Sequence, residues 1–288
     1  MRYCVIGSTG LLGQALIKES KKRGLDIVGI ARTDADFDID ITNDSELEQF
    51  LQKNRFDVVI NTVAIVNHKI CDDFPEKAYI VNARPSAILA ELSKMLGFKY
   101  VYISTDGYFS GDKNKKHNEN SPVEFFNEYA RTKYCGERFA LTNPNSLITR
   151  TNIVGFKGAD VPTFFEWALN AVKNQDEMTL FDDYFTSSIS VAQFSSALFD
   201  LINKNATGLY NVASSEVSSK KQFIEKMAEV FGLDLKNAKT GSVASLNSKR
   251  ADSLGLDVTK AESLLGYKLP DLKEVLTKLK EEYNELQK

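Results

Sequence analysis

The sequence has few of the residues that build metal sites and disulfide frameworks. Its 288 residues include three cysteines, Cys4, Cys71 and Cys135, which are scattered and form no Cys-x-x-Cys pair. Its two histidines, His68 and His117, are far apart in the chain. We therefore expect reduced thiols, as in a cytoplasmic protein, and no zinc or other metal site.

Two further absences exclude classes of partner. No apolar run approaches the roughly 18 residues that a membrane-spanning helix needs, and the apolar strand that begins at Tyr3 leaves no room before it for a signal peptide. The formal net charge of -3 argues against nucleic acid as the main partner, because such proteins usually present a basic surface. We expect a cytoplasmic enzyme with no membrane and no nucleic-acid partner.

Short apolar segments alternate with amphipathic helical patterns through the first half of the chain. Strands are expected at 3–6, 27–31, 58–60, 100–104 and 146–149, and helices at 10–23, 43–54, 76–95 and 127–141. The continuous apolar run at 58–60 is typical of a parallel strand that is buried on both faces. The succession predicts an α/β fold with a Rossmann-like, doubly wound parallel sheet.

The regular alternation ends after residue 150. Helices are expected at 164–172, 219–231 and 271–286, and one more strand at 209–212. We therefore divide the chain into a dinucleotide-binding domain, 1–150, and a smaller α/β lobe, 151–288. The lobe is expected to bind mainly the substrate, with some of its segments returning to the first sheet.

A glycine motif lies between the first strand and the first helix. Gly7, Gly10 and Gly13 have the spacing Gly-x-x-Gly-x-x-Gly. Such glycines permit a tight turn, let the backbone and the helix N-terminus approach a pyrophosphate, and let helix and strand pack closely. Chance turns also produce this spacing, but its position after a strand and before a helix favours dinucleotide binding. Thr9, Leu11 and Leu12 complete the predicted turn.

The residues after the second strand bear on the choice of cofactor. An acid at this point would bind the adenosine ribose and reject a 2′-phosphate, whereas this chain has Arg32. A guanidinium can bind a phosphate with two hydrogen bonds, which favours NADP(H) over NAD(H). The alternative is that Arg32 is a solvated loop charge and that Asp34 or Asp36 binds the ribose. Further residues expected at the cofactor are Asp40, Ile41, Thr62, Val63, Ala64 and Asn82.

A tyrosine and a lysine are four residues apart in the helix expected at 127–141. Tyr129 and Lys133 would share one helix face, where the lysine charge favours the phenolate and brings the phenol closer to its working range. Thr105 follows the preceding strand, and parallel-sheet enzymes place their chemistry at the carboxyl ends of strands. We therefore predict Thr105, Tyr129 and Lys133 as the catalytic set. Without the glycine turn, the pair would be read as an ordinary surface tyrosine and its neighbour.

These motifs together resemble the extended short-chain dehydrogenases, and within them the dTDP-4-dehydrorhamnose reductase family. Residues 104–111, Ser-Thr-Asp-Gly-Tyr-Phe-Ser-Gly, are similar to that family's Ser-Thr-Asp-Tyr-Val-Phe-x-Gly, and residues 129–137 to its Tyr-Gly-x-(Ser/Thr)-Lys-x-x-Gly-Glu. Arg150-Thr151 and the segments 256–260 and 269–271 add to the resemblance. It implies NADP(H)-dependent reduction of a 4-keto group on a nucleotide-linked deoxysugar in polysaccharide biosynthesis, and it leaves a homodimer open.

The chain departs from the family in the expected sugar pocket. Gly107 and Ile153 stand where the family has an aromatic residue and a tryptophan, and His68 stands where it has a valine. Ala15 replaces an acidic residue that the family uses in magnesium-linked dimer contacts. The identity of the sugar therefore does not carry over. The residues expected at the substrate are His68, Thr105, Asp106, Gly107, Asn152, Ile153 and Arg250. For His68, a hydrogen bond within its loop is an equally open alternative.

Two other functions share parts of this pattern. A nucleotide-sugar epimerase or dehydratase uses the same Thr/Tyr/Lys set with tightly bound NAD, although dehydratases often place an acidic pair after Ser-Thr and this chain has only Asp106. A regulatory subunit that binds a dinucleotide without turnover is the other alternative, because the regulatory subunit of methionine adenosyltransferase resembles the same family.

Overall fold

The computed structural model describes residues 1–159, 161–245 and 251–287, which form two compact units. The first unit comprises residues 1–105, 125–150 and 199–210, and the second comprises residues 106–124, 151–198 and 211–288. Residues 106–124, which the division at 150 assigned to the first domain, therefore group with the second unit. Residues 199–210 return to the first.

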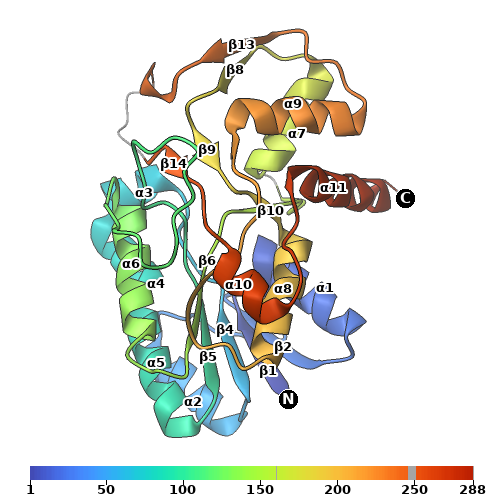
Figure 1. Ribbon diagram of the computed structural model, residues 1–288. Helices are drawn as coiled ribbons and strands as arrows, with labels where there is room; N and C mark the ends of the chain where they lie inside the picture. The colour runs from blue at the N-terminus through green and yellow to red at the C-terminus, as the bar shows by residue number, and fades with distance from the viewer. Residues whose placement is uncertain (160, 246–250, 288) are drawn as a thin grey trace. The chain divides into compact units, whose positions relative to one another are not determined.

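The first unit is built on a parallel sheet of seven strands, which confirms the predicted Rossmann-like fold (Figure 1). Its order is β11-β6-β5-β4-β1-β2-β3, and each neighbouring pair from β6 to β3 is parallel. The strands are β1 (Arg2–Ile6), β2 (Asp26–Ala31), β3 (Phe37–Asp38), β4 (Val58–Asn61), β5 (Lys99–Ile103), β6 (Leu147–Arg150) and β11 (Gly208–Asn211).

Helices cover both faces of this sheet. On one face, α2, α5 and α6 enclose a core that includes Ile30, Phe50 and Leu89. On the other face, α1 packs against β1 and β2, and the ring of Tyr3 contacts that of Phe199 edge-on at 5.5 Å. The helices are α1 (Leu11–Lys22), α2 (Asp44–Lys53), α3 (His68–Asp73), α4 (Pro75–Asn82), α5 (Arg84–Leu96) and α6 (Glu128–Ala140).

The single helix predicted at 76–95 is wrong, because the chain breaks it into α4 and α5 at Ala83. Pro85 has no amide hydrogen to donate, and its ring would clash with the carbonyl four residues earlier in a continuous helix. Proline is tolerated in the first turn of a helix, so α5 begins anew at Arg84. Helix α3 was not predicted from the sequence.

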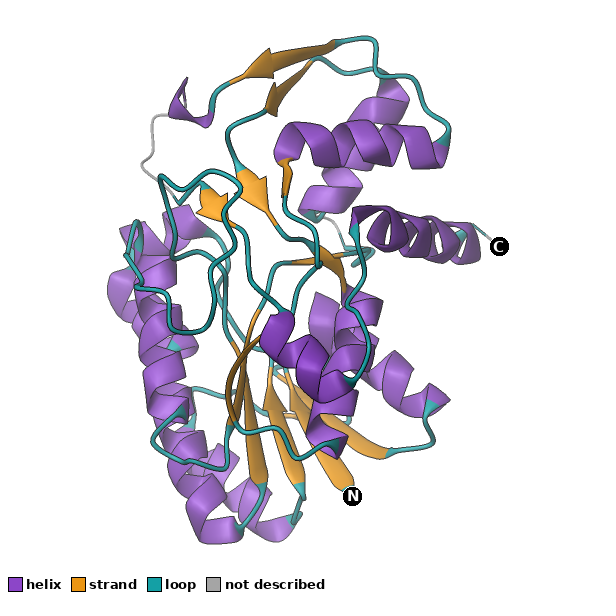
Figure 2. Cartoon of the chain, in the orientation of Figure 1, coloured by secondary structure: helices purple, strands orange, loops and turns teal. Residues whose placement is uncertain are grey.

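Among the described residues, the second unit has three small sheets in place of one large sheet (Figure 2). Its strands are β7 (Ile153–Val154), β8 (Met178–Phe181), β9 (Phe185–Thr186), β10 (Ile189–Ser190), β12 (Ser218–Ser219), β13 (Ala238–Gly241) and β14 (Ser253–Leu254). Its helices are α7 (Phe164–Asn174), α8 (Val191–Asn203, which continues into the first unit), α9 (Lys220–Phe231), α10 (Thr259–Leu265) and α11 (Leu272–Leu286).

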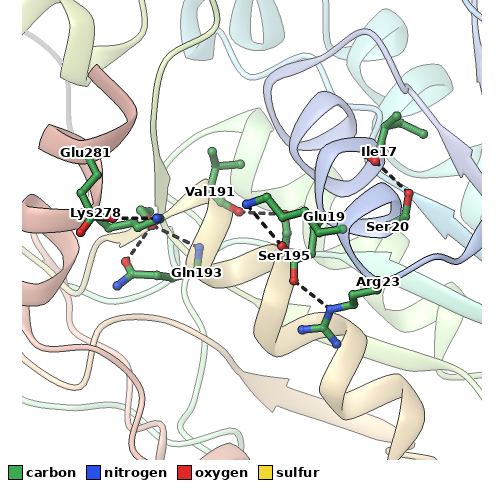
Figure 3. Close-up of polar contacts among 11 residues, drawn as sticks. Ile17, Glu19, Ser20, Arg23, Val191, Gln193, Ser195, Lys278 and Glu281 are labelled. Carbon is green, nitrogen blue, oxygen red and sulfur yellow. Dashed lines mark hydrogen bonds and ion pairs between the residues drawn. The ribbon is translucent and has the colours of Figure 1, made fainter. Parts of the chain in front are cut away.

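Side-chain hydrogen bonds support individual helices in both units (Figure 3). In α1, the Ser20 hydroxyl donates to the carbonyl of Ile17 at 2.8 Å, and Arg23 donates to Glu19 at 2.8 Å. In α8, the Ser195 hydroxyl donates to the carbonyl of Val191 at 2.8 Å. Such bonds satisfy buried hydroxyl groups within the helix itself. No helix among the described residues is long and apolar enough to cross a membrane.

Candidate active site

The glycine motif forms the turn between β1 and α1. Gly7 has φ +86°, a conformation that favours glycine, and its amide donates to the carbonyl of Ile30 at 2.7 Å. A Cβ on Gly13 would lie 2.1 Å from the Gly7 carbonyl oxygen, so glycine is required there for α1 to pack against the turn. The fold itself therefore requires the first and last glycines of the motif.

Gly10 is different, because the protein's own packing leaves room for a side chain. Its φ is -76°, and a Cβ there would meet only the Gly7 carbonyl oxygen, at 3.3 Å. The first bond of α1 runs from the Gln14 amide to the Gly10 carbonyl, so the amides of residues 11–13 have no acceptor within the helix. The space beside Gly10, next to helix amides that have no acceptor within the helix, fits a pyrophosphate.

The loop after β4 lies against this turn. The Thr62 hydroxyl donates to the carbonyl oxygens of Ile6 at 2.8 Å and Gly7 at 3.2 Å. Further along the loop, the side chain of Asn82 accepts the Ile65 amide at 2.7 Å and donates to the Ile65 carbonyl at 3.1 Å. The structure thus brings Thr62, and with it the Val63–Ala64 segment, to the glycine turn. Asn82 holds the backbone of that loop.

The charged residues after β2 differ in their exposure and in their hydrogen bonds. Arg32 is exposed, whereas the Asp36 carboxylate accepts the amide of Gly29 at 2.8 Å. The Thr42 amide, together with the Thr42 hydroxyl and the charge of Arg32, lowers the pKa of the Asp40 carboxyl. The side chain of Ile41 is only 4% exposed and lies in the core, and its place at the cofactor stays a prediction.

Helix α6 carries Tyr129 and Lys133. It begins after an N-cap residue, Asn127, whose side-chain oxygen accepts the Ala130 amide at 2.8 Å. The negative charge of Glu128 in the first turn interacts favourably with the positive end of the helix dipole. Tyr129, Lys133 and Glu137 follow at intervals of four residues, so they share one face. The three side chains therefore lie along one side of α6.

Lys133 is buried and makes no ion pair with any of the residues that the structure describes. Its ammonium lies 4.3 Å from the centre of the Tyr102 ring, and burial lowers its pKa to about 7, an effect that the charge of Glu137 opposes. The Tyr102 hydroxyl donates to the carbonyl oxygens of Asn82 at 2.9 Å and Lys133 at 3.2 Å. An amine with a pKa near neutrality is typical of a site that moves or holds protons.

Glu137 joins α6 to the carboxyl ends of two strands. It accepts from the Arg150 guanidinium at 3.0 and 2.7 Å and from the Ser104 hydroxyl at 3.0 Å. Its side chain is 1% exposed, so this is a buried pair with several hydrogen bonds. Ser104 directly precedes Thr105, and the network therefore fixes the strand end that carries Thr105. The sequence analysis missed this network, although the Gly-Glu of the motif marked it.

Gly136 lets α6 approach β5 closely. A Cβ at this position would lie 2.3 Å from the Tyr102 hydroxyl oxygen and 2.7 Å from the Asn82 carbonyl oxygen. No side chain fits there without moving backbone or a buried ring. The distance from α6 to the sheet is thus set by the absence of a side chain.

His68 is the first residue of α3 and is exposed. Its ring is stacked on that of Tyr129, with centroids 5.1 Å apart and an interplanar angle of 23°. The structure therefore places this predicted substrate residue directly on the predicted proton donor.

The second unit holds the other residues predicted at the substrate. Asn152 donates to the Asp106 carboxylate at 2.8 Å and accepts from the Ser188 hydroxyl at 2.8 Å. Gly107 and Ile153 are half-buried. Arg250 lies outside the described residues. Within this unit Lys220, which the sequence analysis did not single out, lies 4.1 Å from the centre of the Phe164 ring, and burial lowers its pKa to about 8, against the charge of Asp106.

Comparison with known proteins adds a family to this geometry. Residues 1–285 match the family described as RmlD substrate binding domain. The chain belongs to this family. It is 27% identical to the probable low-salt glycan biosynthesis reductase of Haloferax volcanii, over 98% of each chain.

Two solved structures of dTDP-4-dehydrorhamnose reductases are similar over nearly their whole length. The Bacillus anthracis structure, which is in complex with NADP, has a TM-score of 0.88 and 26% identity, with 98% of this chain and 99% of that chain covered. The Clostridium acetobutylicum structure has a TM-score of 0.88 and 25% identity, with both chains fully covered. The family membership thus agrees with the resemblance that the motifs carry.

Proposed function

We propose that this member of the RmlD family catalyses NADP(H)-dependent reduction of a 4-keto group on a nucleotide-linked deoxysugar. The observation that carries the proposal is the face of α6, where Tyr129 and the buried Lys133 precede Glu137, which is hydrogen-bonded to Ser104 beside Thr105. Family membership and the similarity to a reductase in complex with NADP support it.

The nicotinamide cofactor supplies hydride to the carbonyl carbon when it is bound. The open side of Gly10, the amides at the start of α1 and the loop at Thr62–Ala64 would hold the dinucleotide, and Arg32 would bind a 2′-phosphate. The buried ammonium of Lys133 would bind the nicotinamide ribose.

The three catalytic residues have distinct roles in this proposal. Tyr129 gives its phenolic proton to the carbonyl oxygen of the sugar, and the charge of Lys133 favours the phenolate that remains. Thr105 donates to the oxygen on which negative charge develops, an interaction that strengthens in the transition state. The second unit is proposed to bind the nucleotide-sugar, through residues that include Asp106, Gly107, Asn152 and Ile153.

Oxidation of NADPH by the purified protein, with nucleotide-linked 4-keto sugars of different bases, tests this function. We expect turnover that depends on the sugar, and a protein that is purified without bound dinucleotide. Tightly bound NAD and no net oxidation would favour the epimerase or dehydratase. Binding of NADPH without turnover of any such sugar would favour a regulatory subunit. The cytoplasmic location and a homodimer remain predictions, and light scattering of the purified protein checks the latter.

A further inference from the structure

The stacked pair of His68 and Tyr129 joins the starts of two helices. Tyr129 lies in the first turn of α6, and His68 begins α3. A second contact ties the same two segments, because the Asp72 carboxylate accepts the Glu128 amide at 2.8 Å. The imidazole is thus held against the phenol by the packing of α3 on α6.

Asn127 determines which imidazole nitrogen carries the proton. Its Oδ1 accepts the Ala130 amide as the cap of α6, so its Nδ2 must be the atom that lies 3.4 Å from Nδ1 of His68. An amide nitrogen has hydrogens to donate and accepts nothing. Nδ1 of His68 is therefore the acceptor, and the neutral imidazole carries its proton on Nε2.

Protonation of Nδ1 would make both His68 Nδ1 and Asn127 Nδ2 donors, and the hydrogen bond between them would be lost. The charged groups nearby are largely paired: Lys69 with Asp73 at 2.6 Å on α3, and Arg131 with Glu128 at 2.6 Å on α6. Asp72 is exposed on α3, so solvent screens its charge. The remaining ionisable groups on α3, α4 and this face of α6 are Cys71, Glu76, Lys77, Tyr79, Tyr129, Lys133 and Glu137.

We propose that His68 is a positioning residue for Tyr129: the neutral imidazole, held by Asn127 and stacked on the phenol, fixes the orientation in which Tyr129 gives up its proton. This inference rests on the proposed function. A proton donor must keep a narrow range of positions relative to its acceptor, and small misplacements cost large factors in rate. Acid that protonates Nδ1 releases the ring and lowers the rate.

Three variants at position 68 separate stacking from titration. His68→Ala removes the stack, and kcat should fall roughly tenfold to a hundredfold with an unchanged Kd for NADPH. His68→Phe keeps an aromatic ring, and should recover most of the rate and lose the acid-side fall in the pH profile of kcat. His68→Val restores the residue that the resembling family has, and should behave like His68→Ala. An Ala variant with the parent's kcat and pH profile would overturn the proposal.

Two variants of the cap test the role of Asn127, since serine and aspartate both cap helices. Asn127→Ser removes the donor to His68, and should reduce kcat while α6 stays folded. Asn127→Asp offers an acceptor to a protonated Nδ1, so the acid-side fall in rate should disappear. If neither variant changes the pH profile of kcat, the contact with Asn127 does not position the ring.

Nitrogen NMR of the two histidines provides a readout that needs no substrate. The His68 signals, assigned by their loss in His68→Ala, should show a proton on Nε2 at neutral pH. The midpoint of the His68 titration should rise in Asn127→Asp, because a carboxylate favours the imidazolium. A dominant Nδ1–H form would refute the inference. If the parent protein reduces no sugar while these NMR results hold, the proposed function fails and the His68–Asn127 contact stands.

Discussion

Each of the two compact units holds a lysine ammonium against an aromatic ring. Lys133 lies 4.3 Å from the centre of the Tyr102 ring, and Lys220 lies 4.1 Å from the centre of the Phe164 ring. Burial lowers the pKa of both, to about 7 and about 8, and a single carboxylate opposes the shift in each case. Neither ammonium makes an ion pair with any residue that the structure describes.

The neighbours of the two lysines differ. Lys133 is one turn after a tyrosine on α6, and its opposing acid, Glu137, is hydrogen-bonded to Arg150 and Ser104. Lys220 starts α9, and its opposing acid, Asp106, is held by the neutral amide of Asn152. A lowered pKa alone therefore does not identify a catalytic lysine. Under the proposed function, the phenol of Tyr129, one helical turn before Lys133, distinguishes this lysine from Lys220.

The largest expected effect is at that donor. Tyr129→Phe removes the phenolic proton and keeps the ring, so kcat should fall by roughly 10²–10⁴ with the fold intact. The matched control is Tyr184→Phe, whose ring lies 5.7 Å from the Lys220 ammonium and which should keep a kcat close to the parent's. Single-turnover oxidation of NADPH measures both. Equal losses of kcat in the two variants would show that the tyrosine near Lys133 is no more important for the reaction than the tyrosine near Lys220.

The lysines themselves give the next test. Lys133→Met should lower the rate roughly 10²-fold and weaken NADPH binding as well, because one side chain serves both tasks. Lys220→Met should leave the affinity for NADPH unchanged. Calorimetric titration of each variant with NADPH, beside rate measurements, decides the matter. A Lys220→Met protein that binds NADPH poorly would contradict the assignment of the cofactor to the first unit.

Variants of the glycine turn, which is proposed to hold the pyrophosphate, give a second test of the assignment of the cofactor to the first unit. Gly10→Val should lower NADPH affinity by roughly 10²-fold or more, about 2.7 kcal/mol, while the protein stays folded. Its control is Gly13→Ala, in which the new Cβ would lie 2.1 Å from the Gly7 carbonyl oxygen, so stability should fall. Thermal unfolding and calorimetry separate the two losses. An unchanged affinity for NADPH in a folded Gly10→Val protein would refute the placement of the pyrophosphate beside Gly10.

A smaller effect is expected at Arg32. Arg32→Ala should weaken NADPH roughly tenfold, the value of a hydrogen bond to a charged group of about 1.5 kcal/mol, and spare NADH. Arg131→Ala, on the exposed side of α6, is a control of equal charge. Dissociation constants for both dinucleotides provide the check, and equal affinities of the parent for NADPH and NADH would sink the prediction.

The smallest effect is a dependence of stability on pH. The pKa of Lys133 is about 7 in the fold and 10.5 in its ordinary environment, so between these values the unfolded chain binds more protons and stability rises with pH. From about pH 6 to about pH 8 the parent should gain roughly 1 kcal/mol relative to Lys133→Met. For Lys220 the rise should begin about one pH unit later. Urea unfolding without cofactor measures these slopes, and parallel curves for parent and Lys133→Met would show that burial does not lower the pKa of Lys133.

The central strands of the first unit, such as β4 and β5, were predictable because they are buried on both faces. Such strands read as apolar runs, as at residues 58–60, and the helices between them have clear caps such as Asn43 and Asn127. Proximity of Tyr129 to Lys133 followed from helical spacing alone. The break at Ala83 was missed because helical periodicity continues across it, although Pro85 was visible in the sequence.

Other features lie beyond the reach of one sequence. Several strands of the second unit are two residues long, such as β9 and β10, and two residues carry no periodicity. The Glu137–Arg150 pair joins a helix to a strand end, and the stack of His68 on Tyr129 joins residues 61 positions apart in the chain. These contacts depend on how the helices pack, and packing is not encoded in local spacing.

The close approach of α6 to β5 at Gly136 has a consequence for engineering this enzyme. Any side chain there would collide with the buried Tyr102 ring and the Asn82 backbone, and a shift of α6 to relieve the collision would move Tyr129 and Lys133. A mutant library for new sugars should therefore leave position 136 and its buried neighbours Glu137 and Arg150 unchanged. Under the proposed function, sequence diversity is better placed at half-buried Gly107 and Ile153, two residues predicted at the substrate.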